Sequence, residues 1–160
     1  MASKIEREIE IIDIICKNNN KESLLYISGQ IGFVEQMAHK SFSLSSILLA
    51  INGVVLSNKI PGINISSLNN SNTVKGAIFI GFFLIILATI THGMEVYRVK
   101  WVTTPANLTD DITDNDLFEQ KKQAIDIRNE KLKGYHRGLK FLLFGLLSFV
   151  VAFILIFFSN

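Results

Sequence analysis

The residues whose types and spacing best suit chemistry are three histidines, two of them close to a carboxylate. His39 follows Glu35 by four positions, and His92 precedes Glu95 by three, so the members of each pair share one face of a helix. His136 lies just before the last apolar stretch of the chain. Such an interfacial polar cluster could bind a metal ion or sense protons. The alternative is that these histidines simply suit a membrane interface, with an apolar ring body and a polar edge.

A second group of candidate residues is basic. Residues 117–140 carry seven Lys and Arg against Glu119, Asp126 and Glu130, and the basic groups are densest in residues 131–140. This stretch could hold an anionic ligand or lipid head groups. The alternative is the basic collar that ordinarily flanks a membrane span on its cytoplasmic side.

Catalytic motifs are missing from the sequence. There is no HExxH metalloprotease motif, no glycine-rich phosphate loop and no pair of carboxylates within an apolar stretch. Cys16 is the only cysteine, which excludes an intramolecular disulfide and favours a free thiol on a reducing face. We therefore predict a protein that is not an enzyme and that has no cofactor and no bound metal.

The elements that position these residues follow from where charge is missing. Residues 41–58, 76–94 and 141–160 contain no charged side chain, although 19% of the chain is charged. A helix that rises about 1.5 Å per residue needs roughly 20 apolar residues to cross a bilayer core. The sequence therefore predicts an all-α membrane protein with three transmembrane helices, whose long cytoplasmic helical extensions form a small bundle.

The distribution of basic residues predicts the orientation. The segments before, between and after the first two charge-free windows hold five, two and nine of the 16 Lys and Arg. Because cytoplasmic segments are enriched in Lys and Arg, we expect a cytoplasmic N-terminus and an external C-terminus. The expected segments are cytoplasmic helices at 1–40, transmembrane helix 1 at 41–58, an external loop at 59–75, transmembrane helix 2 at 76–94, a cytoplasmic loop and helix at 95–140, and transmembrane helix 3 at 141–160.

The cytoplasmic segments show helical periodicity. Ser3 and Glu6 form a capping-box pattern before a short amphipathic helix, and three asparagines at 18–20 end it. A second helix is expected to begin near Glu22 and to continue into the first span. Its apolar residues recur three or four positions apart: Leu24, Ile27, Ile31, Val34 and Ala38. A stripe with a seven-residue repeat is expected to pack on this face: Phe118, Ile125, Leu132 and Leu139.

Each charge-free window also carries small or weakly polar residues on one helix face. These faces are formed by Ala77, Gly81 and Ala88 in the second window, and by Gly145, Ser148 and Ala152 in the third. In the first window, Ser41, Ser45 and Asn52 form a possible polar span face. One interpretation is close helix packing, within or between chains. The other is that the face of Ser41, Ser45 and Asn52 lines a polar path in an oligomer.

The order of these elements, together with two local segments, resembles a known family. Residues 48–53 read Leu-Leu-Ala-Ile-Asn-Gly, similar to a Leu-Leu-x-x-Asn segment of the Pycsar-type small transmembrane effectors of bacterial cyclic-nucleotide antiphage defence. Residues 127–146 resemble that family's ending of a long helix, Lys, Tyr and an apolar span. Ahead of Leu48, where the family tends to carry Asp-x-Lys-Ala, this chain has Phe42, Leu44 and Ser45.

The resemblance implies a membrane effector that senses a cyclic mononucleotide through its cytoplasmic helices and impairs the bacterial inner membrane by forming homo-oligomers. The implied partners are the lipid bilayer and the nucleotide, while the near balance of acidic and basic residues argues against a nucleic acid polymer. Two alternatives stay open, a constitutive membrane adaptor that docks a protein partner and a small channel subunit. The residues implied as phosphate partners are basic: Arg128, Lys131, Lys133 and Arg137.

Overall fold

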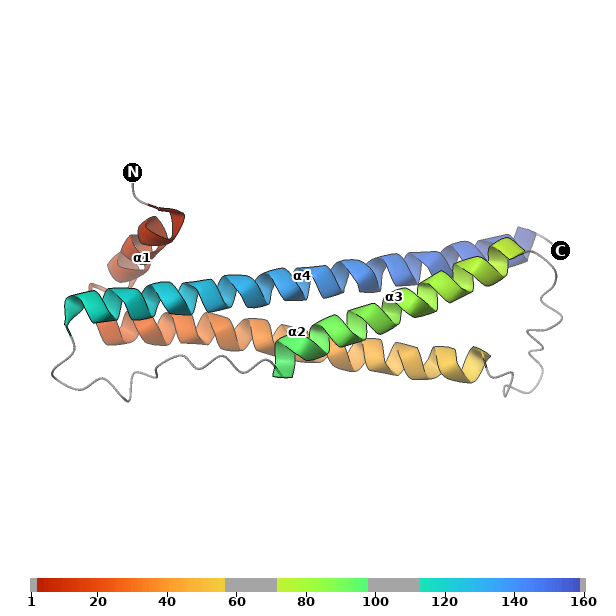
Figure 1. Cartoon of the computed structure of the whole chain (residues 1–160), viewed down its shortest axis with the longest axis horizontal. Coiled ribbons are helices and arrows are strands. Elements are labelled where there is room, and N and C mark those ends of the chain that lie inside the picture. Colours follow the sequence, from red (N-terminus) through yellow and green to blue (C-terminus); the bar gives the residue numbers. More distant parts are fainter. Residues whose placement is uncertain (1–2, 57–71, 98–112, 159–160) are drawn as a thin grey trace. The chain divides into compact units, whose positions relative to one another are not determined.

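The computed structural model describes residues 3–56, 72–97 and 113–158, and these ranges contain four α-helices and no strand. The helices are α1 at Lys4–Ile15, α2 at Asn20–Leu56, α3 at Asn72–Tyr97 and α4 at Asp114–Phe158 (Figure 1). The all-α prediction is confirmed. Most of the predicted external loop at 59–75, and residues 98–112 of the predicted cytoplasmic segment, lie outside the described residues.

The chain divides into two compact units. Unit 1 comprises Met1–Met37 and Tyr97–Lys133, and unit 2 comprises Ala38–Val96 and Gly134–Asn160. Helices α2 and α4 each contribute to both units, whereas α1 belongs to unit 1 and nearly all of α3 to unit 2.

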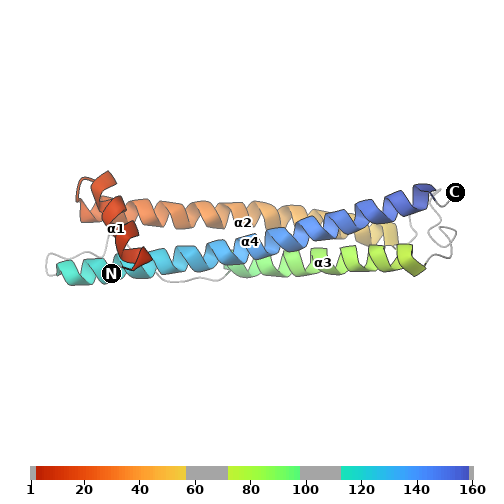
Figure 2. The same ribbon diagram turned by 90° about the horizontal axis from the view of Figure 1, so that it is seen from above.

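The first helix begins where the sequence predicts it. The backbone N–H of Glu6 donates a hydrogen bond to the Ser3 hydroxyl, and the Glu6 carboxylate accepts one from the Ser3 backbone, which completes the capping box. Beyond Ile15, Lys17 and Asn18 adopt positive φ angles of 53° and 58°, which end α1 in a tight turn before α2 begins. In Figure 2, α1 crosses over α2 and α4 within unit 1.

The core of unit 1 is built in part from the stripes that the sequence predicts for its helices. All five apolar residues of the stripe on α2, from Leu24 to Ala38, are buried, the last of them where unit 2 begins. From α4, Ile125 is fully buried and Phe118 packs against the same core, whereas Leu132 and Leu139 of the predicted stripe are half-buried. The apolar face of α1 closes this core with Ile9, Ile12 and Cys16.

The small-residue faces of α3 and α4 are in contact within unit 2. A Cβ added at Gly81 would lie 3.1 Å from the carbonyl oxygen of Gly145, and one added at Gly145 would lie 3.1 Å from that of Gly81. The Ser148 hydroxyl donates a 2.7 Å hydrogen bond to the Ala77 carbonyl. Small residues thus allow the two backbones to approach closely, within a single chain.

The prediction of three transmembrane helices is wrong. Within the described residues, two helices are long and apolar enough to cross a membrane, Thr73–Tyr97 and Asp114–Leu155, with mean hydropathies of 2.2 and 2.4. The predicted transmembrane helix 1, at 41–58, is not among them. Its residues 57 and 58 lie outside the described residues, and the rest of it carries polar side chains among the apolar ones: Ser41, Ser43, Ser45, Ser46 and Asn52.

The outward faces of the two apolar helices support a membrane location. Only 22% of the most apolar window in each helix is buried within the protein. Large apolar side chains point outward instead, and Phe79 and Phe153 are about 70% exposed. In a bilayer these apolar side chains would contact lipid, whereas in a water-soluble protein they would be exposed to water.

Candidate functional site

The charged part of α4 is linked to α1 and α2 by three ion pairs in unit 1. Lys121 Nζ lies 2.5 Å from Asp13 Oδ1, and Arg128 Nη1 lies 2.6 Å from Glu8 Oε1. A third pair joins Lys131 Nζ to Glu35 Oε1 at 2.7 Å. Both carboxylates of the first two pairs belong to α1, so this short helix neutralises two cations of α4.

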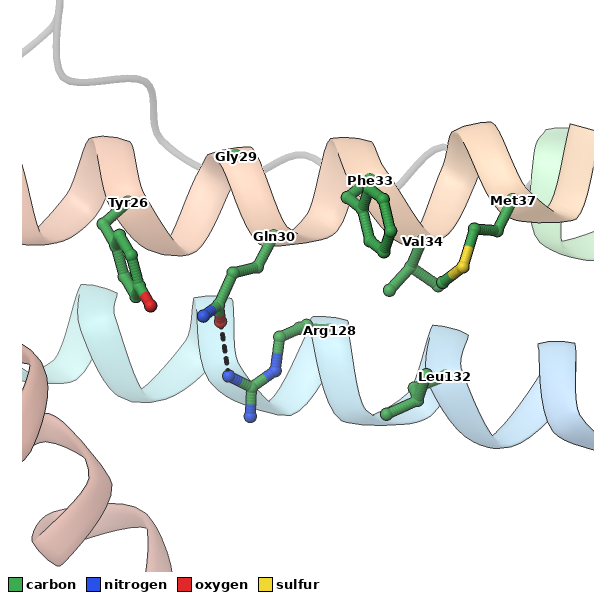
Figure 3. A pocket seen from close by; sticks show the side chains of 8 residues that line it. All are labelled: Tyr26, Gly29, Gln30, Phe33, Val34, Met37, Arg128 and Leu132. Atoms are coloured by element: carbon green, nitrogen blue, oxygen red, sulfur yellow. Dashed lines mark hydrogen bonds between the residues drawn. The ribbon is translucent and has the colours of Figure 1, made fainter.

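A groove of about 450 Å³ opens between α2 and α4 in unit 1, and Arg128 contributes to its wall (Figure 3). Tyr26 and Phe33 leave aromatic surface exposed along it, 43% and 60% of their residue area. A Cβ added at Gly29 would meet nothing within 4 Å, so this side of the groove is open. The lining residues are Tyr26, Gly29, Gln30, Phe33, Val34, Met37, Arg128 and Leu132.

Among the described residues that line this groove, Arg128 carries the one charged side chain, and each of its three guanidinium nitrogens has a partner. Nη1 donates a 2.6 Å hydrogen bond to Gln30 Oε1, in addition to its ion pair with Glu8 (Figure 3). Nε and Nη2 both donate to Asn129 Oδ1. An anion that enters the groove would therefore have to replace Glu8 as the partner of Arg128. A phosphate can do so because its oxygens match the planar, two-pronged geometry of the guanidinium as carboxylate oxygens do.

The four residues predicted to bind phosphate are divided between the two units. Arg128 lines the groove, whereas the Lys131 side chain is 3% exposed and pairs with Glu35. Lys133 is exposed at the end of unit 1, and Arg137 is exposed in unit 2. Of the four, Arg128 alone lies in a described cavity.

The residues of the predicted interfacial polar cluster are also divided between the two units. Glu35 lies in unit 1 with its partner Lys131, while His39 and His136 are exposed in unit 2. His92 and Glu95 are buried together in unit 2. The described residues contain no group of three or more His, Cys, Asp or Glu side chains able to hold a metal ion.

On the predicted polar face of the first window, Ser45 is fully buried and its hydroxyl donates to the Phe42 carbonyl of the same helix. Ser41 and Asn52 are half-buried. A polar path along this face stays a prediction, and the Ser45 hydroxyl is already satisfied by its own backbone.

Sequence reasoning missed the pairing of α1 with α4. Lys121 and Arg128 interrupt the seven-residue apolar stripe of α4 and so weaken it as a coiled-coil seam. In the structure, Lys121 forms an ion pair with Asp13, and Arg128 forms one with Glu8. The available signal was charge complementarity, since α1 presents acids next to its apolar face and α4 presents bases next to its own.

The described residues define an all-helical protein with a charged helical unit and a second unit that contains the most apolar parts of two membrane-compatible helices. No family model, curated protein or solved structure matches the chain.

Proposed function

We propose that this protein is a membrane effector that binds a cyclic mononucleotide through unit 1 and responds by oligomerising and impairing the bacterial inner membrane during antiphage defence. The observation that carries the proposal is the placement of Arg128. It lies in an aromatic-walled groove, on a helix that continues from a charged segment to an apolar one without interruption. The resemblance of residues 48–53 and 127–146 to Pycsar-type effectors supplies the class of ligand.

The chemistry of the groove suits a ligand with a flat ring and one negative charge. Tyr26 and Phe33 offer exposed aromatic surface on which a nucleobase can stack. Arg128 offers a guanidinium for the phosphate, in exchange for the Glu8 carboxylate. A ligand that takes Arg128 thereby releases one of the two ion pairs between α1 and α4. This release gives the ligand different affinities for two states of unit 1, which any ligand-driven change requires.

The proposed orientation places unit 1 in the cytoplasm. Residues 95–140 carry nine of the 16 Lys and Arg, as cytoplasmic segments do. The N-terminal helix α1 packs on the charged part of α4, so the N-terminus belongs on the same side of the membrane.

Calorimetric titration of the purified full-length protein in lipid nanodiscs with the cyclic mononucleotides of adenine, guanine, cytosine and uracil tests the binding step. We expect saturable binding of at least one of them. The variant Arg128→Lys keeps the charge but loses the planar fork, and should bind about tenfold more weakly, the equivalent of one charge-assisted hydrogen bond. Absence of saturable binding to all four nucleotides would overturn the proposal.

Two matched controls lie on the same helix. The Lys122 side chain is 42% exposed and lies 3.6 Å from Glu119, and Lys133 is exposed and does not line the groove of Arg128. Lys122→Glu and Lys133→Glu should bind the nucleotide as the wild type does. Equal losses in these variants and in Arg128→Lys would show that general positive charge, rather than the groove, attracts the ligand.

A second candidate function, a constitutive adaptor, is favoured by an apolar ridge on α1. Ile11, Ile14 and Ile15 are 58–73% exposed, on the opposite side of the helix from the core. Expression in bacteria separates the candidates. An effector should be harmless alone and toxic with a nucleotide cyclase, an adaptor harmless in both cases, and a channel subunit should leak ions without any nucleotide.

A further inference from the structure

A polar pair is buried between α3 and α4 in unit 2, near the end of α3. His92 is 0% exposed and Glu95, three positions later on the same helix face, is 8% exposed. Both lie within the candidate membrane helix Thr73–Tyr97. Ionisable side chains in such helices are costly and for that reason usually mark functional sites.

Two glycines of α4 create the space for this pair. A Cβ added at Gly138 would lie 2.6 Å from Cδ2 and Nε2 of the His92 ring, and one added at Gly134 would overlap the Glu95 carboxylate. The two glycines are four residues apart, the spacing that allows close helix approach in membranes. Here the space is filled by an imidazole and a carboxylate, so any side chain at either glycine would displace one of them.

The His92 ring lacks what buried polar groups normally have. Among the residues that the structure describes, neither Nδ1 nor Nε2 has a hydrogen-bond partner of good geometry, although the Tyr135 backbone is close by. Most buried polar atoms in folded proteins are paired, because an unpaired one loses its hydration without compensation. The packed arrangement therefore accommodates a neutral imidazole at a cost, and provides no acceptor for the second N–H of a charged one.

The groups around His92 are few. From α4, the Tyr135 ring lies with its centre 5.8 Å from that of His92, and the next two residues, His136 and Arg137, are exposed. From α2, the apolar Phe42 ring approaches Gly93, next to His92. On α3 itself, Glu95 is the neighbouring acid.

We propose that His92 and Glu95 form a proton-binding site that controls how tightly the end of α3 packs on α4. Uptake of a proton by His92 creates an imidazolium with two N–H donors, which must reach water or the Glu95 carboxylate to be satisfied. Both routes require the ring to leave its place over Gly138, so proton uptake is coupled to separation of the two helices. The ligand of this pair is a proton rather than a metal ion, because His92 and Glu95 offer only two metal-ligating side chains and the described residues add no third.

The test measures helix separation against pH in the full-length chain, in nanodiscs and without nucleotide. Spin labels are placed at the exposed residues Met94 and Lys140, after Cys16→Ser removes the native thiol. Between pH 8 and pH 5 we expect the distance between the labels to increase and broaden. This response should be lost in His92→Gln and retained in His39→Gln and His136→Gln, which change exposed histidines. A pH-independent distance, or an unchanged response in His92→Gln, would overturn the proposal.

A second measurement guards against misfolding of the His92→Gln variant. Histidine-labelled protein without other substitutions gives three imidazole signals by NMR, assigned with the His39 and His136 variants. The His92 signal should change over the same pH range as the label distance. If it titrates without any change of distance, proton binding is not coupled to helix packing and the proposal fails. Because no nucleotide is present, none of these outcomes depends on whether the groove of unit 1 binds one.

Discussion

The two units of this chain handle buried polarity in opposite ways. In unit 1, the buried ammonium groups of Lys121 and Lys131 each lie within 2.7 Å of a carboxylate from another helix. In unit 2, the buried His92 ring packs on glycine, and neither of its nitrogens has a hydrogen-bond partner of good geometry among the described residues. The difference separates two kinds of helix association, one specified by charge pairing and one by close backbone approach. Unit 1 should accordingly fail when a charge is removed, and unit 2 when volume is added.

The largest expected effect comes from breaking the best-buried pair of unit 1. Asp13 accepts hydrogen bonds from Lys121 and from the Ser23 hydroxyl, the latter at 2.6 Å. Asp13→Ala leaves the Lys121 side chain, which is 4% exposed, with Asn20 Oδ1 as an acceptor for its ammonium. Removing one partner of a buried pair costs about 3–5 kcal/mol, so we expect α1 to detach from α4. Hydrogen exchange of the α1 amides measures this detachment.

The control for this change is a pair on the same helix that lies in solvent. Glu119 and Lys122 are 60% and 42% exposed and 3.6 Å apart. Glu119→Ala should change stability by less than about 0.5 kcal/mol, because exposed pairs contribute little. If both variants left α1 equally protected, the apolar contacts of Ile9 and Ile12 would hold α1 without the charges, and the contrast between the units would be lost.

An intermediate effect is expected from adding one methyl group in unit 2. Gly138→Ala places a Cβ against the His92 ring, which is rigid and enclosed. Overpacking of this kind costs about 1–3 kcal/mol. Gly76→Ala is the matched control, since a Cβ at this helical glycine meets nothing within 4 Å and should stabilise the helix by up to about 1 kcal/mol. Thermal unfolding in detergent, followed by circular dichroism, should order the proteins as Gly76→Ala, wild type and Gly138→Ala, and the reverse order would contradict the packing described for unit 2.

Most local structure could be predicted from the sequence, because it depends on local patterns. The capping box at Ser3 and the buried stripe from Leu24 to Ala38 follow from spacing alone. The prediction of transmembrane helix 1 was wrong, and its charge-free window at 41–58 contains five serines and two asparagines.

The candidate site was predictable only in part, since its contacts join distant segments. Arg128 was identified as a ligand-binding candidate, but its groove depends on Tyr26 and Phe33, which lie about a hundred positions earlier in the chain. The packing of His92 against Gly138 and of Glu95 against Gly134 could not be predicted from the sequence either. A helix face can be deduced from periodicity, but which face of another helix it meets depends on the tertiary packing.

The smallest expected effect concerns the first turn of α4, which is exposed and is held by local polar contacts. The Thr113 hydroxyl donates a 2.6 Å hydrogen bond to Asp116 Oδ2, and the Thr113 backbone N–H donates a second one at 3.2 Å. These bonds lower the pKa of Asp116, the hydroxyl having the larger influence. A carboxyl with a lowered folded-state pKa stabilises the helix at pH values above its unfolded pKa, near 4. This contribution is lost as the pH falls through the folded-state pKa.

Amide exchange in the first turn of α4 should therefore accelerate on acidification below about pH 4 in the wild type. In Asp116→Asn, amide exchange should already be faster at neutral pH and should change less on acidification. Equal acid responses in the wild type and in Asp116→Asn would assign the effect to another carboxyl. Asp114→Asn, in the same first turn, is the matched comparison.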